Sequence, residues 1–439
     1  MQNNTQILNQ IDAKLRDLPC ESIALQCKFT QRLSGKITPR SWVKAFCCLA
    51  SDSSSSLRHF AWILGFLTQT VLSKQAVRKR LLSQGTEFLK QVLAYLITKS
   101  AQLPRLRSTG ILSCFKRVLV QDSTMIKLPS RLAAVYPGCV NQTAAKISIM
   151  RIQAVLDILS ETFVDFSLSG YTRNDQAASL DIVSIAKPGD LILRDLGYFV
   201  INVFKLLSDK GIFFVSRITP RVSFRDPASG NPINLLASLR KMKTLDQSVI
   251  MGSKSTISVR LVAIPLSQAV ANERRRKARL KRDKRNHYSK EYYALLSWQI
   301  LITNVDSSVL SAKDLSDIYG LRWQIEVVFK TWKSFLHFEN ISQNASTFQV
   351  EALIYARLIY AVLFHIIFWR VLQPDINSSN RQPISLLKAI DLIRHLSSLM
   401  IAEAIVSTSP QILNAAFYKH TAYDSRKRKS YMDIRKLLG

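Results

Sequence analysis

The sequence predicts an α/β fold in which a mixed β-sheet carries helices on its faces. Two short, wholly apolar runs, Val118–Val120 and Leu191–Leu193, are typical of central strands that are buried on both sides. The segments around them alternate between strand-like and helix-like patterns. The chain has 439 residues, of which 47% are hydrophobic, so it can bury two or three cores and is not a disordered basic protein.

Residues 1–107 are predicted to form an N-terminal helical DNA-binding domain. Within it, residues 61–81 resemble a helix-turn-helix in which Ser73 would be the N-cap of the second helix. The side chains that would face a DNA groove are Lys74, Gln75, Arg78 and Lys79. The alternative is an ordinary amphipathic helix with a solvated basic face, and short patterns of this kind do not decide between the two.

Residues 108–221 are predicted to form the first part of the α/β core. The run Val118–Val120 leads to Asp122, and the run Leu191–Leu193 leads to Asp195. Other strands are expected at Ile147–Leu159, Glu161–Gly170 and Ile212–Arg217, and helices at Ala177–Ala186 and Val200–Leu207. The two acidic residues would therefore stand at the carboxyl ends of buried strands.

Residues 222–300 are predicted to form a β-rich insertion domain with a basic loop. Strands are expected at Val249–Ile264 and Leu295–Thr303. Between them, Glu273–Lys290 holds ten basic and two acidic residues. Beside a polyanion such a segment would clamp phosphates; alone it would be a solvated loop or helix. The charge of the whole chain favours the clamp.

Residues 301–372 are predicted to return to the core and to be strongly helical, and residues 373–439 to form a helical and basic tail. The apolar stretch Leu358–Trp369 is short for a membrane span, contains His365 and is bracketed by arginines. We therefore expect a buried core helix there, and no membrane partner.

The charge of the chain predicts a polyanionic partner. There are 61 Lys and Arg residues against 30 Asp and Glu, which gives a formal net charge of +31. Lys and Arg release condensed counterions when they neutralise phosphates, so double-stranded DNA is the natural partner. An anionic membrane surface is the alternative. The six cysteines include no C-x-x-C pair and no signal peptide is apparent, so we expect a protein of the cytoplasm.

One stretch combines a carboxylate with groups that suit phosphate. At 100° per residue, five polar side chains would fall within roughly 80° on one side of a helix. They are Tyr319, Arg322, Glu326, Lys330 and Lys333. Such a stripe could be a surface ion-pair ladder, but the stretch is otherwise short of acids on that face. It is long enough, at about 20 Å, to follow several phosphates of a DNA backbone.

Asp122, Asp195 and Glu326 could together supply three hard oxygen ligands. The carboxyl ends of adjacent central strands lie side by side in open α/β sheets, which would bring the two aspartates together. Mg²⁺ and Mn²⁺ prefer carboxylates with water and substrate phosphate. Two such ions about 3.5–4 Å apart could activate a water or a 3′-OH and stabilise the leaving oxygen of an in-line displacement.

At these residues the chain resembles the insertion-sequence-four family of DDE transposases. The family's signature, Y-(2)-R-(3)-E-(6)-K, is met by Tyr319, Arg322, Glu326 and Lys333. The motifs Asp122-Ser123-Thr124 and Arg194–Phe199 precede it in the expected order. The resemblance covers roughly residues 110–372.

The resemblance implies an RNase H-like core, interrupted by the β-rich insertion in the 131 residues that separate the second acid from the third (326 − 195). Asp122, Asp195 and Glu326 would be the catalytic metal ligands. DNA phosphates at the transposon end would be held by Tyr319, Arg322 and Lys333, whereas Lys330 is added from helix geometry alone. Arg217 matches an arginine that approaches the end DNA in relatives. Trp298 would stack on a flipped base, or, alternatively, would be a core tryptophan at the start of a strand.

The resemblance therefore predicts a transposase that binds terminal inverted repeats, pairs two transposon ends as a homodimer, and joins them to target DNA. Cleavage and strand transfer would use two Mg²⁺ or Mn²⁺ ions per active site and pass through a hairpin intermediate. One alternative is a metal-dependent nuclease of the same fold. The other is an inactive, transposase-derived DNA-binding protein, against which the intact set of three acids argues.

Overall fold

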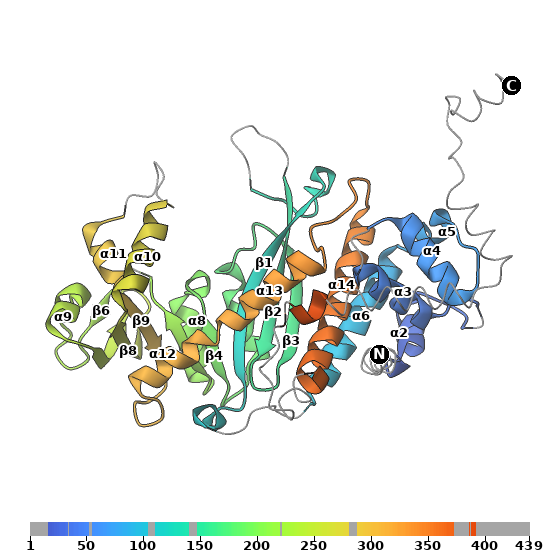
Figure 1. The fold of residues 1–439 in the computed structure, drawn as a ribbon. Helices are drawn as coiled ribbons and strands as arrows, with labels where there is room; N and C mark the ends of the chain where they lie inside the picture. The colour runs from blue at the N-terminus through green and yellow to red at the C-terminus, as the bar shows by residue number, and fades with distance from the viewer. Residues whose placement is uncertain are drawn as a thin grey trace, which may run out of the picture. The chain divides into compact units, whose positions relative to one another are not determined.

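A computed structural model describes residues 16–33, 35–51, 55–103, 110–139, 147–219, 222–280, 288–372, 386 and 388–391 of the chain. The predicted tail at 373–439 lies almost entirely outside the described residues. The chain divides into two compact units. One comprises Met1–Leu96 with Thr331–Gly439, and the other comprises Ile97–Lys330 (Figure 1).

The second unit is built on one nine-stranded sheet, in the order β3-β2-β1-β4-β5-β9-β8-β7-β6. The strands are β1 Val118–Leu128, β2 Ser148–Asp157, β3 Thr162–Gly170, β4 Leu191–Arg194, β5 Phe213–Arg217, β6 Phe224–Arg225, β7 Leu245–Met251, β8 Ile257–Pro265 and β9 Trp298–Thr303. Strands β1, β4 and β5 are parallel, and β2 and β3 extend them as antiparallel neighbours. This mixed arrangement, with the central strand β4 wholly buried, fits an RNase H-like core.

The strands β6 to β9, from the predicted insertion, continue the same sheet. Strand β9 pairs antiparallel with β5 on one side and with β8 on the other. Between β8 and β9 stand helices α10 Gln268–Leu280 and α11 Lys290–Leu295, while α9 Leu235–Lys241 precedes β7. Strand β5 is therefore hydrogen-bonded to β4 on one edge and, on the other, to residues 301–303 of β9, directly after the predicted insertion.

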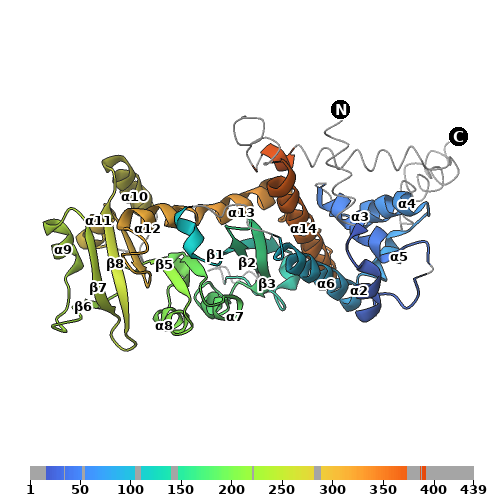
Figure 2. The ribbon, with the colours of Figure 1, turned by 90° about the horizontal axis from the view of Figure 1, so that it is seen from below.

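Helices cover both faces of the core strands. Helices α7 Ile182–Ile185 and α8 Ile201–Asp209 lie on one face, and α12 Ala312–Gly320 and the start of α13 Trp323–Phe335 lie on the other (Figure 2). A continuous hydrophobic cluster joins α8 to the buried side of the sheet, from Leu119 in β1 to Met251 in β7. This packing supports the first half of β1, which leads to Asp122, and β4, which leads to Asp195.

The first unit is helical. Its helices are α2 Cys20–Gln26, α3 Pro39–Ser51, α4 Leu57–Thr68, α5 Lys74–Arg78, α6 Ser83–Ser100 and α14 Thr347–Ile367. Helix α14 packs along α3, and α3 along α4. Thr347–Arg370 is long and apolar enough to cross a membrane, but 89% of its apolar window is buried within the protein, as a core helix would be. At the predicted helix-turn-helix, Ser73 caps α5 by accepting a hydrogen bond from the backbone N–H of Ala76.

Three sequence predictions about local structure are wrong. The strand at Asp122 does not end there but continues to Leu128, because β2 pairs with it along its whole second half. The predicted strand Val249–Ile264 is two strands, β7 and β8, joined by a turn at Gly252, whose φ of 103° suits glycine. The predicted helix at Ala177–Ala186 is a 3₁₀ turn followed by one turn of α7.

The polar stripe from Tyr319 to Lys333 is also not on one helix. Helix α12 ends at Gly320, and α13 begins at Trp323. Between them, successive backbone N–H groups bond to the carbonyl three residues back, as Arg322 does to Tyr319 at 3.2 Å. This 3₁₀-like tightening changes the angular phase, so a helical wheel that assumes 100° per residue fails across it.

Candidate active site

The sheet places Asp122 and Asp195 side by side. The last pair of residues in the parallel ladder between β1 and β4 is Gln121 and Arg194, so the two aspartates are the next residues along their strands. Each aspartate side chain is partly exposed, 19% for Asp122 and 35% for Asp195. The two carboxylates therefore open toward solvent from a buried parallel ladder.

Glu326 and Arg322 complete the cluster from the α13 side. The Arg322 guanidinium lies 3.6 Å from the Asp122 carboxylate and 3.9 Å from that of Asp195. It also donates a short, charge-assisted hydrogen bond to Glu326, one helical turn away. All three acids of the predicted catalytic set thus face a single guanidinium. We call Asp122, Asp195 and Glu326, together with Arg322, the acid cluster.

Burial shifts the pKa values of the charged groups in the acid cluster. Burial raises the pKa of Asp122 to about 7, although a hydrogen bond from the Ser123 backbone N–H and the charge of Arg322 act in the opposite direction. Burial acts to lower the pKa of Arg322, but Tyr319, Asp195 and Glu326 outweigh it and raise that pKa. The cluster is therefore stabilised as a unit by its one cation, and adding positive charge there would favour ionised carboxylates.

The donor set suits a divalent cation. Three carboxylates directed at one positive charge are the hard oxygen ligands that Mg²⁺ and Mn²⁺ take. Among the described residues, no three Asp, Glu, His or Cys side chains already form a metal-binding group. At the acid cluster, the Arg322 guanidinium contacts all three carboxylates.

A second layer of polar side chains fixes the loop and strand around Asp122. Ser123 donates to Asp175 at 2.7 Å, and Arg151 donates to both Ser123 and Asp175, at 2.8 and 2.9 Å. A Cβ added at Gly197 would lie 3.1 Å from the Asp175 carboxylate, so this acid packs against the turn that follows Asp195. Sequence reasoning missed Asp175, which lies in a loop with no motif around it.

Asp175→Asn is expected to keep DNA binding but to slow strand cleavage by roughly 10- to 100-fold, the usual cost of losing a group that orients a metal ligand. It should also raise the Mg²⁺ concentration needed for half-maximal cleavage. A titration of cleavage against Mg²⁺ measures both effects. Asp181→Asn, which breaks another aspartate–arginine pair in the same unit, is the matched control. An unchanged Mg²⁺ dependence in Asp175→Asn would contradict a positioning role.

Tyr319 is placed beside the acid cluster and is buried. Its hydroxyl donates to the carbonyl of Arg194 at 3.3 Å, and the Arg322 guanidinium lies 5.9 Å from the centre of its ring. Burial raises the pKa of Tyr319 to about 12. The tyrosine therefore supports Arg322 and the end of β4.

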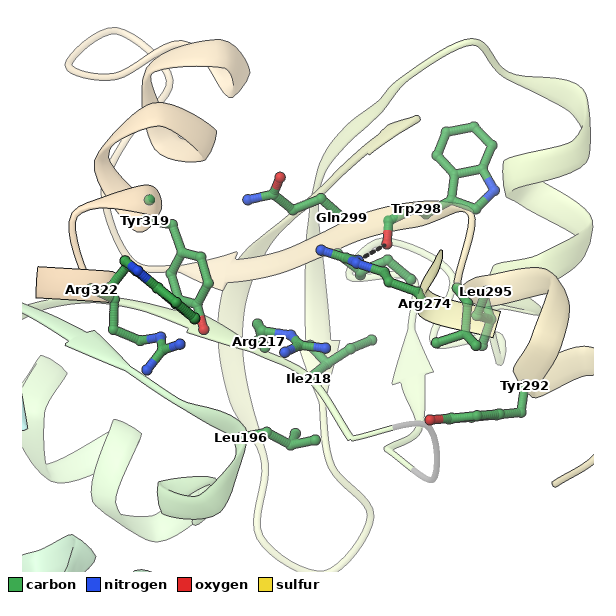
Figure 3. A pocket seen from close by; sticks show the side chains of 14 residues that line it. Leu196, Arg217, Ile218, Arg274, Tyr292, Leu295, Trp298, Gln299, Tyr319 and Arg322 are labelled. Atoms are coloured by element: carbon green, nitrogen blue, oxygen red, sulfur yellow. Dashed lines mark hydrogen bonds between the residues drawn. The ribbon is translucent and has the colours of Figure 1, made fainter. Parts of the chain in front are cut away.

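A pocket of about 330 Å³ adjoins Tyr319 and Arg322 (Figure 3). Its polar wall carries two further arginines, Arg217 from the end of β5 and Arg274 from α10. Burial, and then the neighbouring charge of Arg217, lower the pKa of Arg274. Three guanidinium groups around one pocket favour an anionic ligand.

The other wall of the pocket is aromatic and aliphatic. Tyr292 of α11 directs its phenol ring into the pocket, whereas the indole of Trp298 points away from Arg217 and Arg322 (Figure 3). Trp298 also packs partly against the hydrophobic cluster of the sheet. Tyr292 is stacked on Tyr288, with ring centres 4.4 Å apart. Sequence reasoning named Trp298 but missed Tyr292, because only the folded structure shows that α11 brings Tyr292 to this pocket.

The basic segment predicted at Glu273–Lys290 is partly a brace for this pocket. Arg274 donates to the Trp298 carbonyl at 3.2 Å, and Arg275 donates to the Tyr293 carbonyl and to Ser297. Residues 281–287 lie outside the described part of the chain. At least two of the ten basic side chains therefore hold α10 against the start of β9.

The remaining predicted DNA-binding residues are on the surface. Lys330 and Lys333 are exposed on α13, and Lys333 lies 3.7 Å from Glu339. Exposed Trp323, at the first turn of the same helix, lines the pocket and was not singled out from the sequence. Lys74 and Arg78 are exposed on α5, in the helical unit.

Comparisons with known proteins identify the family of the chain. The family model described as "Transposase DDE domain" matches residues 113–361. The transposase of insertion sequence element IS231F from Bacillus thuringiensis subsp. israelensis is 28% identical over 85% of this chain and 82% of its own length. That of IS1151 from Clostridium perfringens is 26% identical over 78% of this chain and 76% of its own. A cryo-EM structure of the piggyBac transposase synaptic complex with hairpin DNA covers 95% of this chain and 84% of its own at 10% identity, with a TM-score of 0.44.

A mixed α/β sheet that gathers three acids next to an arginine-lined pocket defines the class of DNA strand-transfer enzymes with a DDE centre. Within that class, the chain belongs to the insertion-sequence-four family of DDE transposases. It is a DNA transposase, an enzyme that catalyses DNA cleavage and transfer, and its family implies dependence on a divalent metal.

Proposed function

We propose that the chain is a cut-and-paste transposase that binds the terminal inverted repeats of its insertion sequence and moves them by two-metal-ion phosphoryl transfer through a hairpin intermediate. Asp122, Asp195 and Glu326 are the proposed catalytic residues. The observation that carries this proposal is their convergence on one cation, Arg322, at the edge of a buried parallel ladder.

In this proposal the three carboxylates hold two Mg²⁺ ions, or Mn²⁺, per active site. When bound, such ions lower the pKa of the attacking water or 3′-OH and neutralise charge on the leaving oxygen. The residues of the chain orient these reactants. Arg322 is displaced from between the carboxylates and is then available, with Tyr319, to hold a non-scissile phosphate. Asp175 and Arg151 keep Asp122 in place through Ser123.

Arg217 and Arg274 are proposed to hold the phosphates of a nucleotide that is turned out of the duplex. Tyr292 is proposed to pack on its base, because its ring is directed into the pocket. Trp298 also lines the pocket, although its indole points away from the arginines, and its proposed stacking role rests on the resemblance. Lys330 and Lys333 would contact the backbone of the same DNA, as exposed lysines on one helix can. A base held out in this way relieves the bend that a hairpin end requires.

We further propose that the chain has the domains predicted from its sequence. These are an N-terminal DNA-binding domain to residue 107, a core at 108–221 and 301–372, an insertion domain at 222–300 and a C-terminal segment from 373. Lys74 and Arg78 would contact the repeat. A homodimer would pair two transposon ends and receive target DNA, in the bacterial cytoplasm or nucleoid. The net charge of +31 supports contact with this much DNA.

The test is incubation of the purified chain with a duplex that carries the ends of its own element, in Mg²⁺ and in Ca²⁺. Hairpin-ended fragments are expected in Mg²⁺ only, because Ca²⁺ binds carboxylates in a looser geometry that supports binding better than catalysis. Denaturing electrophoresis distinguishes hairpins from open ends. Cleavage that yields open ends alone would contradict the hairpin route, and no cleavage in Mg²⁺ or Mn²⁺ would contradict the proposed activity.

A further inference from the structure

A second cavity, of about 680 Å³, lies within the helical unit and shares no lining residue with the acid cluster or with the arginine-lined pocket. Its walls come from the start of α4, from α5, and from the segment between α13 and α14 together with the first turn of α14. The residues that line it are Ser55, Ser56, Leu57, Arg58, Lys74, Gln75, Arg78, Asn340, Ser342, Asn344 and Gln349. We call this cavity the α5 groove.

We propose that the α5 groove binds duplex DNA and reads base edges of the transposon end, with Gln75 and Asn344 as specificity-determining residues. The proposal rests on the proposed function and deepens it, because it names the residues that would choose the sequence. It also joins two parts of the chain in one reading surface, since Asn344 lies 269 residues after Gln75 (344 − 75). The predicted helix-turn-helix alone does not include the second wall.

The composition of the groove suits nucleic acid. It carries three cationic side chains, Arg58, Lys74 and Arg78, and no acidic side chain. Four of its other residues are amides: Gln75, Asn340, Asn344 and Gln349. Asn and Gln pair with adenine through a donor and an acceptor together, and Arg and Lys pair with guanine or with phosphate. A neutral groove lined by Ser and amides alone would lack the charge to hold a phosphate backbone.

The exposed side chains are carried on a backbone that is held firmly. The buried Arg357 of α14 donates to the carbonyls of Phe338 and Asn340, at 3.3 and 3.0 Å. Ser346 caps α14 by accepting from the Gln349 backbone N–H, and Thr86 of α6 donates to the Phe348 carbonyl at 3.1 Å. These contacts order the segment before α14, so its side chains need lose little freedom when DNA binds.

The two walls present different chemistry at the same opening. Gln75 and Arg78 are exposed on α5, whose buried side is anchored by Val77. Asn344 is exposed on the opposite wall, between the buried residues Ile341 and Ala345. A duplex entering the groove would therefore meet α5 on one side and an ordered loop on the other. This arrangement allows base readout and phosphate contact by one short stretch of DNA.

The experiment measures the affinity of the full chain for two duplexes in Ca²⁺, one with the element's terminal repeat and one with the same bases scrambled, across a series of salt concentrations. Gln75→Ala and Asn344→Ala are each expected to reduce the affinity ratio between the two duplexes about tenfold, as loss of a bidentate base contact does. Arg78→Ala is expected to weaken both duplexes alike and to reduce the salt slope by about 1.

Lys90→Ala and Gln91→Ala, exposed on α6 of the same unit, are the matched controls for charge and amide. The two controls should keep the wild-type affinity ratio between the repeat and the scrambled duplex. If Gln75→Ala and Asn344→Ala also keep that ratio, the α5 groove does not read the sequence. The proposal is refuted as well if the wild-type chain does not prefer the repeat. Cleavage in Mg²⁺ is scored separately. A chain that prefers the repeat through Gln75 and Asn344 but never cleaves refutes the proposed function and leaves the groove standing.

Discussion

Asp122→Ala, Asp195→Ala and Glu326→Ala are each expected to bind a transposon-end duplex as tightly as the wild-type chain and to cut it at least about 10³-fold more slowly. The acid cluster makes this separation possible, because its carboxylates are the proposed metal ligands, whereas the proposed contacts to DNA come from other side chains, Arg322 among them. Loss of metal-based charge stabilisation costs several kcal/mol at the transition state. About 4 kcal/mol corresponds to a factor of 10³ in rate.

Single-turnover cleavage in saturating Mg²⁺ and binding in Ca²⁺ measure the two quantities on the same proteins. Asp317→Ala removes an exposed acid from α12 in the same unit and should change neither. A cysteine at position 326, made as Glu326→Cys, should regain cleavage in Mn²⁺ better than in Mg²⁺, since a thiolate prefers the softer ion. Near-normal cleavage by any one of the alanine variants would remove that residue from the metal site.

The strands that carry the two aspartates could be predicted because their apolar runs are short, continuous and followed by acids. The extension of β1 beyond Asp122 was less visible, because Ser123 and Lys127 interrupt the apolar pattern. In the structure, residues 124–128 alternate between buried and exposed, which is the period of a half-buried strand. That alternation could have been found from the sequence. Its pairing with β2 could not, since register depends on contacts that are distant in the sequence.

The residues of the candidate site that belong to the signature spacing, such as Arg322 and Glu326, could be predicted from the sequence. Arg322 was expected to hold phosphate, yet in the structure it is the counter-ion of the three acids. This role depends on the 3₁₀-like turn between α12 and α13, and no helical wheel contains such a turn. Asp175 and Tyr292 have no motif, and only hydrogen bonding and the fold of α11 over β9 bring them to the site.

Tyr292→Ala is expected to slow hairpin formation about tenfold or more while the first nick stays within about twofold of the wild-type rate. Its ring faces the arginine-lined pocket and is backed by Tyr288. Stacking of a base on an aromatic side chain is worth about 1–3 kcal/mol, which is roughly a factor of 5 to 150. The first nick precedes the extrusion of the base, so it does not require that contact.

Trp298→Ala is expected to show the same selective loss, together with a lower Tm. The lower Tm follows because the indole also packs against the hydrophobic cluster of the sheet, so its removal leaves a cavity. Trp298→Phe should restore much of the packing and much of the stacking. Gel assays that resolve nicked from hairpin-ended DNA, with melting curves, separate the two effects. Equal slowing of both steps by Trp298→Ala, beside a selective effect of Tyr292→Ala, would make Trp298 a core residue and leave Tyr292 as the platform for the base.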